Sequence, residues 1–108
     1  MESIEFEKRQ KLALDVIKQV FGTDSGEDSI NLFVSHHLEE LPQSYWQQHL
    51  GTSTPAPSAV LGLLQLRESW GEGDVECFDF TLPDGATDYV VSVHFDRSGD
   101  IDGISMES

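Results

Sequence analysis

Three short runs of alternating apolar residues, separated by two turn sequences, occupy the C-terminal third of this 108-residue chain. The runs cover residues 75–82, 88–95 and 101–106, and each turn between them contains a glycine. Alternation with a period of two, interrupted by glycine-containing turns, is typical of antiparallel strands. The pattern therefore predicts a β-meander, which limits the fold to one built around a small antiparallel sheet.

The apolar side chains of these runs are expected on one face of the sheet, with mostly polar side chains on the other. The inward-facing set is Phe78, Phe80, Leu82, Tyr89, Val91, Val93, Phe95, Ile104 and Met106. An antiparallel sheet with one apolar face is covered on that face by another layer, here a layer of helices.

The N-terminal part of the chain supplies the helices. Apolar residues recur at steps of three and four over residues 4–21 and 30–41, which predicts amphipathic helices. Shorter helices are expected over residues 42–50 and 58–63, since a proline fits the first turn of each. These patterns together predict an α+β fold.

We expect N-terminal helices packed on one face of a three- or four-stranded antiparallel β-meander. The length of the chain predicts a single domain over residues 1–108, with a helical part at 4–63 and the meander at 64–106.

Residues 64–70 fit two structures. Leu64, Leu66 and Trp70 fall on one side of a two-residue repeat, which favours a strand with these side chains on one face. A helix that continues through Arg67 is the alternative, because leucine and glutamine favour helices. The alternation leads us to expect the strand.

The net charge of −14 is the one extreme value of the composition. Residues 51–108 hold eleven acids and two bases, a net charge of −9. Such a surface repels phosphate groups, so neither nucleic acid nor an anionic membrane is an expected partner. It attracts basic proteins instead and speeds their encounter. A purely solubilising role for the acids remains the alternative.

The location expected from the sequence is the cytoplasm. No apolar run approaches the ~20 residues of a membrane-spanning helix. The acidic first residues lack the layout of a signal peptide, and a single cysteine, Cys77, forms no disulfide within the chain.

Acidic residues of the meander are the candidate partner-binding residues, and they are Asp79, Asp84, Asp88, Asp96, Asp100 and Asp102. Tyr45 and Trp46 are candidate aromatic anchors, because aromatic side chains are enriched at interface hot spots. The alternative is that Trp46 and Leu50, four residues apart, attach the short helix to the core.

No catalytic residues, metal ligands or cofactors are predicted. His36 and His37 are expected at the surface beside Glu39 and Glu40, which would favour their charged forms. Zinc needs three or four ligands, and the sequence offers no matching pair. Cys77 is expected to be a packed strand residue, because neighbouring acids disfavour the thiolate.

The acids from Asp96 to Glu107 resemble the spacing of a calcium loop. Its sixth position requires glycine for a sharp turn, and this chain has Ile101 there. A β-hairpin with Gly99 in a left-handed conformation explains the segment without a metal ion.

Short motifs in residues 64–108 carry a resemblance to a known family. They are Phe78-Asp79-Phe80, Thr87-Asp88-Tyr89-Val90, Phe95-Asp96 with Gly99, and Ile104-Ser105-Met106-Glu107-Ser108. This part of the chain resembles a small family of uncharacterised bacterial proteins, the domain of unknown function numbered two thousand and four. The resemblance implies a compact cytoplasmic α+β domain and supplies no catalytic residues. In size and charge the chain is also similar to bacterial immunity proteins.

Three functions follow as hypotheses. The first is a non-enzymatic protein–protein interaction module, in its sharpest form an immunity-type inhibitor of a basic bacterial toxin or enzyme. The alternative is a small ligand-binding or enzymatic domain, whose pocket would lie between helices and sheet and involve His94, Asp79 or Cys77. The third is a structural subunit that dimerises through a sheet edge.

Overall fold

A computed structural model describes residues 2–71 and 76–107, with side chains from residue 4 onward. The elements follow one another as α1 (Glu2–Val20), α2 (Ile30–Glu40), α3 (Gln43–Leu50), α4 (Pro57–Leu61), β1 (Gln65–Trp70), β2 (Cys77–Thr81), β3 (Val90–Phe95) and β4 (Ile101–Glu107). Helices precede a four-stranded antiparallel sheet in the order β1-β2-β3-β4, which confirms the α+β prediction.

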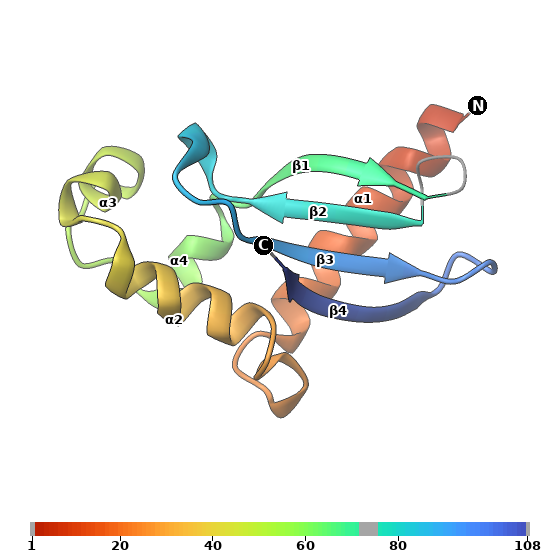
Figure 1. Ribbon diagram of the computed structural model, residues 1–108, viewed down its shortest axis with the longest axis horizontal. Helices are drawn as coiled ribbons and strands as arrows, with labels where there is room; N and C mark the ends of the chain where they lie inside the picture. The colour runs from red at the N-terminus through yellow and green to blue at the C-terminus, as the bar shows by residue number, and fades with distance from the viewer. Residues whose placement is uncertain (1, 72–75, 108) are drawn as a thin grey trace.

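The helices lie on one side of the sheet. Figure 1 shows α1 crossing behind the strands, with α2 and α4 gathered near one end and α3 beyond them. Among the described residues no helix lies over the front face of the sheet in that view. The described elements therefore form two layers, and none of the described helices covers the second face of the sheet.

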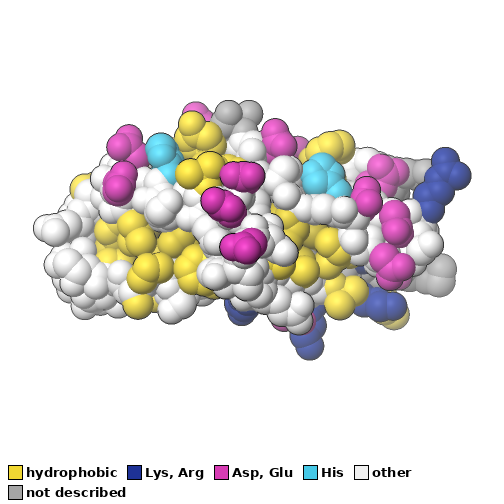
Figure 2. Space-filling model, turned by 90° about the horizontal axis from the view of Figure 1, so that it is seen from below, with side chains coloured by type: hydrophobic (Ala, Val, Ile, Leu, Met, Phe, Trp, Pro, Cys, Tyr) yellow, Lys and Arg dark blue, Asp and Glu magenta, His cyan; other side chains and the backbone are white. Residues whose placement is uncertain are grey.

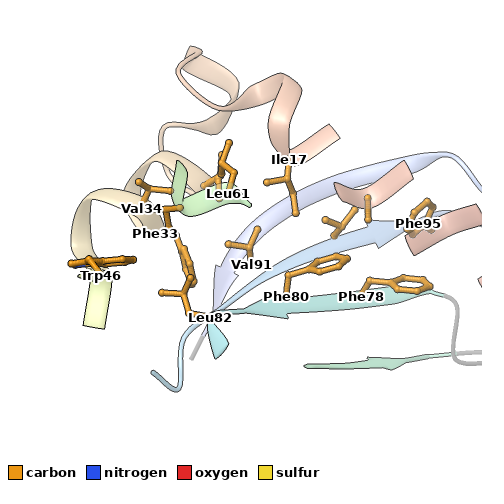
Figure 3. Packing of buried hydrophobic residues seen from close by; sticks show 14 residues of the cluster. Ile17, Phe33, Val34, Trp46, Leu61, Phe78, Phe80, Leu82, Val91 and Phe95 are labelled. Carbon is orange, nitrogen blue, oxygen red and sulfur yellow. The ribbon is translucent and has the colours of Figure 1, made fainter. Parts of the chain in front are cut away.

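The core forms between these two layers, as the alternation predicts. Phe78, Phe80 and Leu82 are fully buried, and so are Val91 and Val93 on the neighbouring strand. They pack against residues from the helices, including Ile17, Phe33, Val34 and Leu61 (Figure 3). Burying one large apolar side chain contributes about 1.5–3 kcal/mol, so this layer holds the helices on the sheet.

Residues 65–70 form a strand, which confirms that prediction, but the orientation predicted for Trp70 is wrong. In the register, Leu66 pairs with Phe80 and Glu68 pairs with Asp79, so Arg67 is an inserted residue, a β-bulge. An inserted residue reverses the alternation beyond it. Trp70 therefore points away from the core, on the face opposite Leu66.

A second bulge lies in β4. His94 pairs with Gly103 and Phe95 pairs with Ile101, which leaves Asp102 as the inserted residue. The preceding turn has Gly99 at a φ of 86°, so the predicted hairpin with a left-handed glycine is confirmed.

Positive charge is concentrated on α1, which carries four of the six basic residues of the chain: Lys8, Arg9, Lys11 and Lys18. Arg9 forms an ion pair with Glu5 and lies 5.3 Å from the centre of the Phe95 ring. In Figure 2, acidic side chains are scattered over the visible surface among hydrophobic and other side chains, and most of the visible basic ones lie along its lower edge. On α1 itself the four bases are matched by four acids, Glu2, Glu5, Glu7 and Asp15, so this helix carries no net charge.

Candidate functional site

The face of the sheet that no described helix covers, here called the open face, is the candidate site. Strand pairing places on it Glu68 opposite Asp79, Trp70 opposite Cys77, Asp79 opposite Ser92, and Ser92 opposite Ser105. Cross-strand partners share a face, so these mostly polar side chains lie together on the open face, where Cys77 and Ser92 are buried and Trp70 is exposed.

Asp79 is the centre of a hydrogen-bond network on the open face. Its Oδ1 accepts from Ser92 Oγ at 2.7 Å and lies 3.5 Å from the donating Cys77 Sγ. Its Oδ2 accepts from Trp70 Nε1 at 3.1 Å. Because both carboxylate oxygens are occupied, the network fixes the positions of the aspartate and the indole ring rather than leaving a free general base.

Cys77 is buried beneath this network. Desolvation raises the pKa of its thiol to about 12, and the nearby Asp79 carboxylate acts in the same direction. A nucleophilic cysteine requires a thiolate, which these surroundings disfavour at neutral pH. The prediction that Cys77 is a packed strand residue is confirmed.

A hollow of about 280 Å³ lies next to Asp79 on the open face. It is lined by Arg67, Glu68, Asp79, Asp88, Val90 and Glu107. Four of these residues are acids and one is a base. Arg67 donates from Nη1 to the backbone carbonyl of Asp88 at 3.3 Å. The hollow is therefore an acidic site with one cation at its wall, which favours a positively charged group.

Trp70 is the exposed aromatic residue of the open face. Its side chain is 47% exposed, and its ring packs edge-on against His94 with 6.3 Å between ring centres. Sequence reasoning missed Trp70 as a candidate binding residue because the alternation placed it in the core. The bulge at Arg67 turns Trp70 to the open face, and a bulge cannot be recognised in a single sequence.

The predicted acidic residues do not form one patch. Asp79 and Asp88 lie at the hollow, whereas Asp96, Asp100 and Asp102 belong to the β3–β4 hairpin. Asp84 lies in the β2–β3 connection, at the opposite end of the sheet (Figure 1). Asp96 stabilises its own turn, since its Oδ1 accepts from the backbone amides of Ser98 and Asp100.

Asp84 and Tyr45 connect α3 to the β2–β3 turn. Asp84 Oδ2 lies 3.0 Å from His49 Nε2, and the Tyr45 hydroxyl donates to the Pro83 carbonyl at 3.0 Å. Desolvation, together with the Asp84 carboxylate, raises the pKa of Tyr45. Asp84 has a φ of 66°, a left-handed conformation that aspartate tolerates better than most residues. These contacts hold α3 against the β2–β3 connection.

Trp46 is not a surface anchor, which corrects that prediction. Its side chain is 1% exposed and belongs to the hydrophobic cluster (Figure 3). Leu50 packs against the same cluster. The alternative, in which Trp46 and Leu50 attach the short helix to the core, is confirmed.

His37 is buried, so its predicted surface location is wrong. Its Nδ1 donates to the Phe33 carbonyl at 2.6 Å, since a carbonyl only accepts. Its Nε2 then accepts from the Thr87 hydroxyl at 2.8 Å, and Thr87 Oγ1 accepts from the Tyr89 amide. Burial lowers the pKa of His37, so the carboxylates nearby do not maintain a charged imidazole.

Metal binding gains no support from this geometry. Within residues 2–71 and 76–107, no three or more His, Cys, Asp or Glu side chains are grouped to hold an ion.

None of the described helices has the length and apolar character needed to cross a lipid bilayer.

Comparison of the chain with family models, curated proteins and solved structures finds no match in any of the three. Function is therefore inferred from the residues of the open face.

Proposed function

We propose that this protein is a non-enzymatic interaction module that binds a basic protein through its open face. The acidic hollow receives a lysine or arginine of the partner, and Trp70 packs against the adjoining apolar or cationic surface. The observation that carries the proposal is the combination of four carboxylates around one hollow with a half-exposed tryptophan on the uncovered side of the sheet.

The distribution of charge supports the same partner. Both parts of the chain are net negative, with −5 over residues 1–50 and −9 over residues 51–108. The larger negative charge belongs to the part that contains the sheet, so a cationic partner is attracted more strongly there, and its association rate rises at low ionic strength.

In its finer form, the proposal is an immunity-type inhibitor that acts in the cytoplasm and covers the cationic substrate surface of a bacterial toxin or enzyme. A ligand pocket between helices and sheet gains no support, because buried apolar side chains occupy that space.

The test compares two double variants with the same total charge. Glu68→Gln with Asp88→Asn neutralises two acids of the hollow, whereas Asp100→Asn with Asp102→Asn neutralises two acids of the β3–β4 hairpin. Immobilised wild-type protein is used to capture partners from the source cells at low and high ionic strength, and captured proteins are identified and then purified for affinity measurements.

We expect the wild type to capture a basic protein, and we expect the affinity for that protein to fall as salt is added. The affinity is expected to fall further in the variant of Glu68 and Asp88 and to be retained in the variant of Asp100 and Asp102. Trp70→Ala is expected to weaken it as well, since hot-spot aromatics contribute about 2 kcal/mol or more. Equal losses in both double variants would show that net charge alone acts. Failure to capture any basic protein at low ionic strength would refute the proposal.

A further inference from the structure

A second groove lies where α2 meets the end of β4, and we name it the α2–β4 groove. It has a volume of about 390 Å³ and is lined by Asp28, Leu32, His36, Tyr89, Met106 and Glu107. Figure 2 views the molecule from the side of these elements and shows hydrophobic surface next to a histidine and between acidic side chains. The groove therefore combines an apolar lining with negative charge.

The apolar lining comes from both layers of the fold. Leu32 projects from α2 with 48% of its side chain exposed, although Phe33 and Val34 beside it are fully buried. Tyr89 and Met106 are half-buried and pack against the core cluster from the sheet side. A leucine that is exposed beside such side chains gains contacts when another apolar group enters the groove.

The wall of the groove is held in place by neighbouring contacts. The Tyr89 ring packs edge-on against His36, with ring centres 5.2 Å apart, and against His37 at 5.8 Å. The Thr87 hydroxyl accepts a hydrogen bond from the Tyr89 amide and donates one to the buried His37 imidazole. A wall fixed in this way loses little conformational entropy on binding, which favours recognition of a defined segment.

Carboxylates accompany the apolar lining. Asp28 lies two residues before α2 begins, and Glu107 lies at the end of β4. Glu107 also lines the acidic hollow of the open face, so the two depressions meet at this residue. Charge complementarity therefore selects a segment in which cations accompany an apolar side chain.

We propose that the α2–β4 groove binds a peptide segment of the basic partner in which one large apolar side chain is flanked by lysine or arginine. The apolar side chain packs among Leu32, Tyr89 and Met106, and the flanking cations pair with Asp28 and Glu107. This inference rests on the proposed function, because it specifies the chemistry of the same partner. It adds a recognition site on the helical side of the sheet.

The probe is a short synthetic peptide in which one leucine is flanked on each side by two lysines. A second peptide replaces that leucine with serine, and a third replaces the lysines with glutamate. Each peptide is titrated into the isotopically labelled full chain, and amide chemical shifts are followed by NMR. We expect the largest shifts around Leu32, Tyr89 and Met106, and binding about fivefold weaker for the serine peptide.

Matched variants locate the binding site. Leu32→Ser removes the exposed leucine of the groove, and Leu12→Ser removes an exposed leucine of α1, which is 40% exposed and lines no part of the groove. We expect peptide binding to be about fivefold weaker for Leu32→Ser and unchanged for Leu12→Ser. Asp28→Asn combined with Glu107→Gln is expected to weaken binding and to reduce its dependence on salt.

Several outcomes overturn the inference. Equal binding of the leucine and serine peptides means that charge alone attracts them, and equal affinity of both leucine variants places the site elsewhere. A dimer that dissociates in Leu32→Ser assigns the groove to a second copy of this chain. If the peptide fails while capture of a basic protein depends on Glu68 and Asp88, only the groove is refuted. If the peptide binds and no basic protein is captured, only the proposed function is refuted.

Discussion

Replacement of the buried His37 by leucine is expected to make the stability of the protein less sensitive to acid. The imidazole joins α2 to the β2–β3 connection through the Thr87 hydroxyl. It also contacts the rings of Phe33 and Tyr89, with centres 4.2 and 5.8 Å away. Its titratable neighbours are His36 and Glu40 on its own helix, and Tyr89 faces it from the sheet.

The magnitude at neutral pH follows from the contacts that are lost. The hydrogen bond to Thr87 contributes about 1 kcal/mol, and the ring contacts contribute a similar amount. The Phe33 carbonyl keeps its helical amide donor, so it is not orphaned. The free energy of unfolding of His37→Leu is therefore expected to be about 2 kcal/mol below that of the wild type near pH 7.5.

Acid reduces this difference. Burial lowers the pKa of folded His37 below its ordinary value of 6.5, so below that pH the unfolded chain binds more protons than the folded one. The stability contributed by neutral His37 is complete above pH 6.5 and is lost as the pH falls toward the folded-state pKa. One proton changes the free energy of unfolding by at most about 1.4 kcal/mol per pH unit.

The assay is urea unfolding of both proteins, followed by tryptophan fluorescence, near pH 7.5, 6.5 and 5.5 (roughly one pH unit on each side of the ordinary histidine value). Groups other than His37 titrate in both proteins. Their contributions therefore cancel in the difference between the two free energies of unfolding. We expect a difference of about 2 kcal/mol at the highest pH and a smaller difference at the lowest. A constant difference would show that burial does not lower the pKa of His37, and a difference that widens in acid would show that the fold favours the charged imidazole.

Two further predictions concern residues fixed by packing. Cys77 is expected to react with a thiol reagent about a thousandfold more slowly in the native protein than in denaturant, because its pKa rises from 9.0 to about 12; comparable rates in the two states would contradict this. Gly26→Ala is expected to destabilise the fold by about 1–3 kcal/mol in thermal or urea unfolding, since a Cβ there would lie 2.6 Å from the Val20 carbonyl oxygen. The control is Gly62→Ala, whose nearest contact is an ordinary 3.4 Å, and an equal loss in both variants would refute the steric argument.

The order of elements was predictable because local signals agree with the tertiary structure. Strand alternation in residues 75–106, glycine at each turn and helical spacing before them all indicate the same two layers. Cys77 was assigned correctly as a packed residue because a mid-strand position depends only on local geometry. Trp46 was predicted to be an anchor, although its four-residue spacing from Leu50 had indicated the packed alternative that the structure shows.

Errors arose where one residue changes the pattern. The bulge at Arg67 turns Trp70 to the open face, and no local propensity signals an inserted residue. His37 was detectable, because it follows Phe33 by four residues and Val34 by three and so lies on the buried stripe of α2. Its polarity led to a surface assignment, although a buried histidine is acceptable when both ring nitrogens find partners.

Both outermost strands of the sheet contain an inserted charged residue, Arg67 in β1 and Asp102 in β4. An insertion interrupts the regular ladder of free amides and carbonyls that a foreign strand would copy, and a charge at that point adds a solvation penalty to any such pairing. Both borders of the sheet are therefore poor templates for growth into fibrils. Protection of the edges and the proposed binding surface thus belong to different parts of the same four strands.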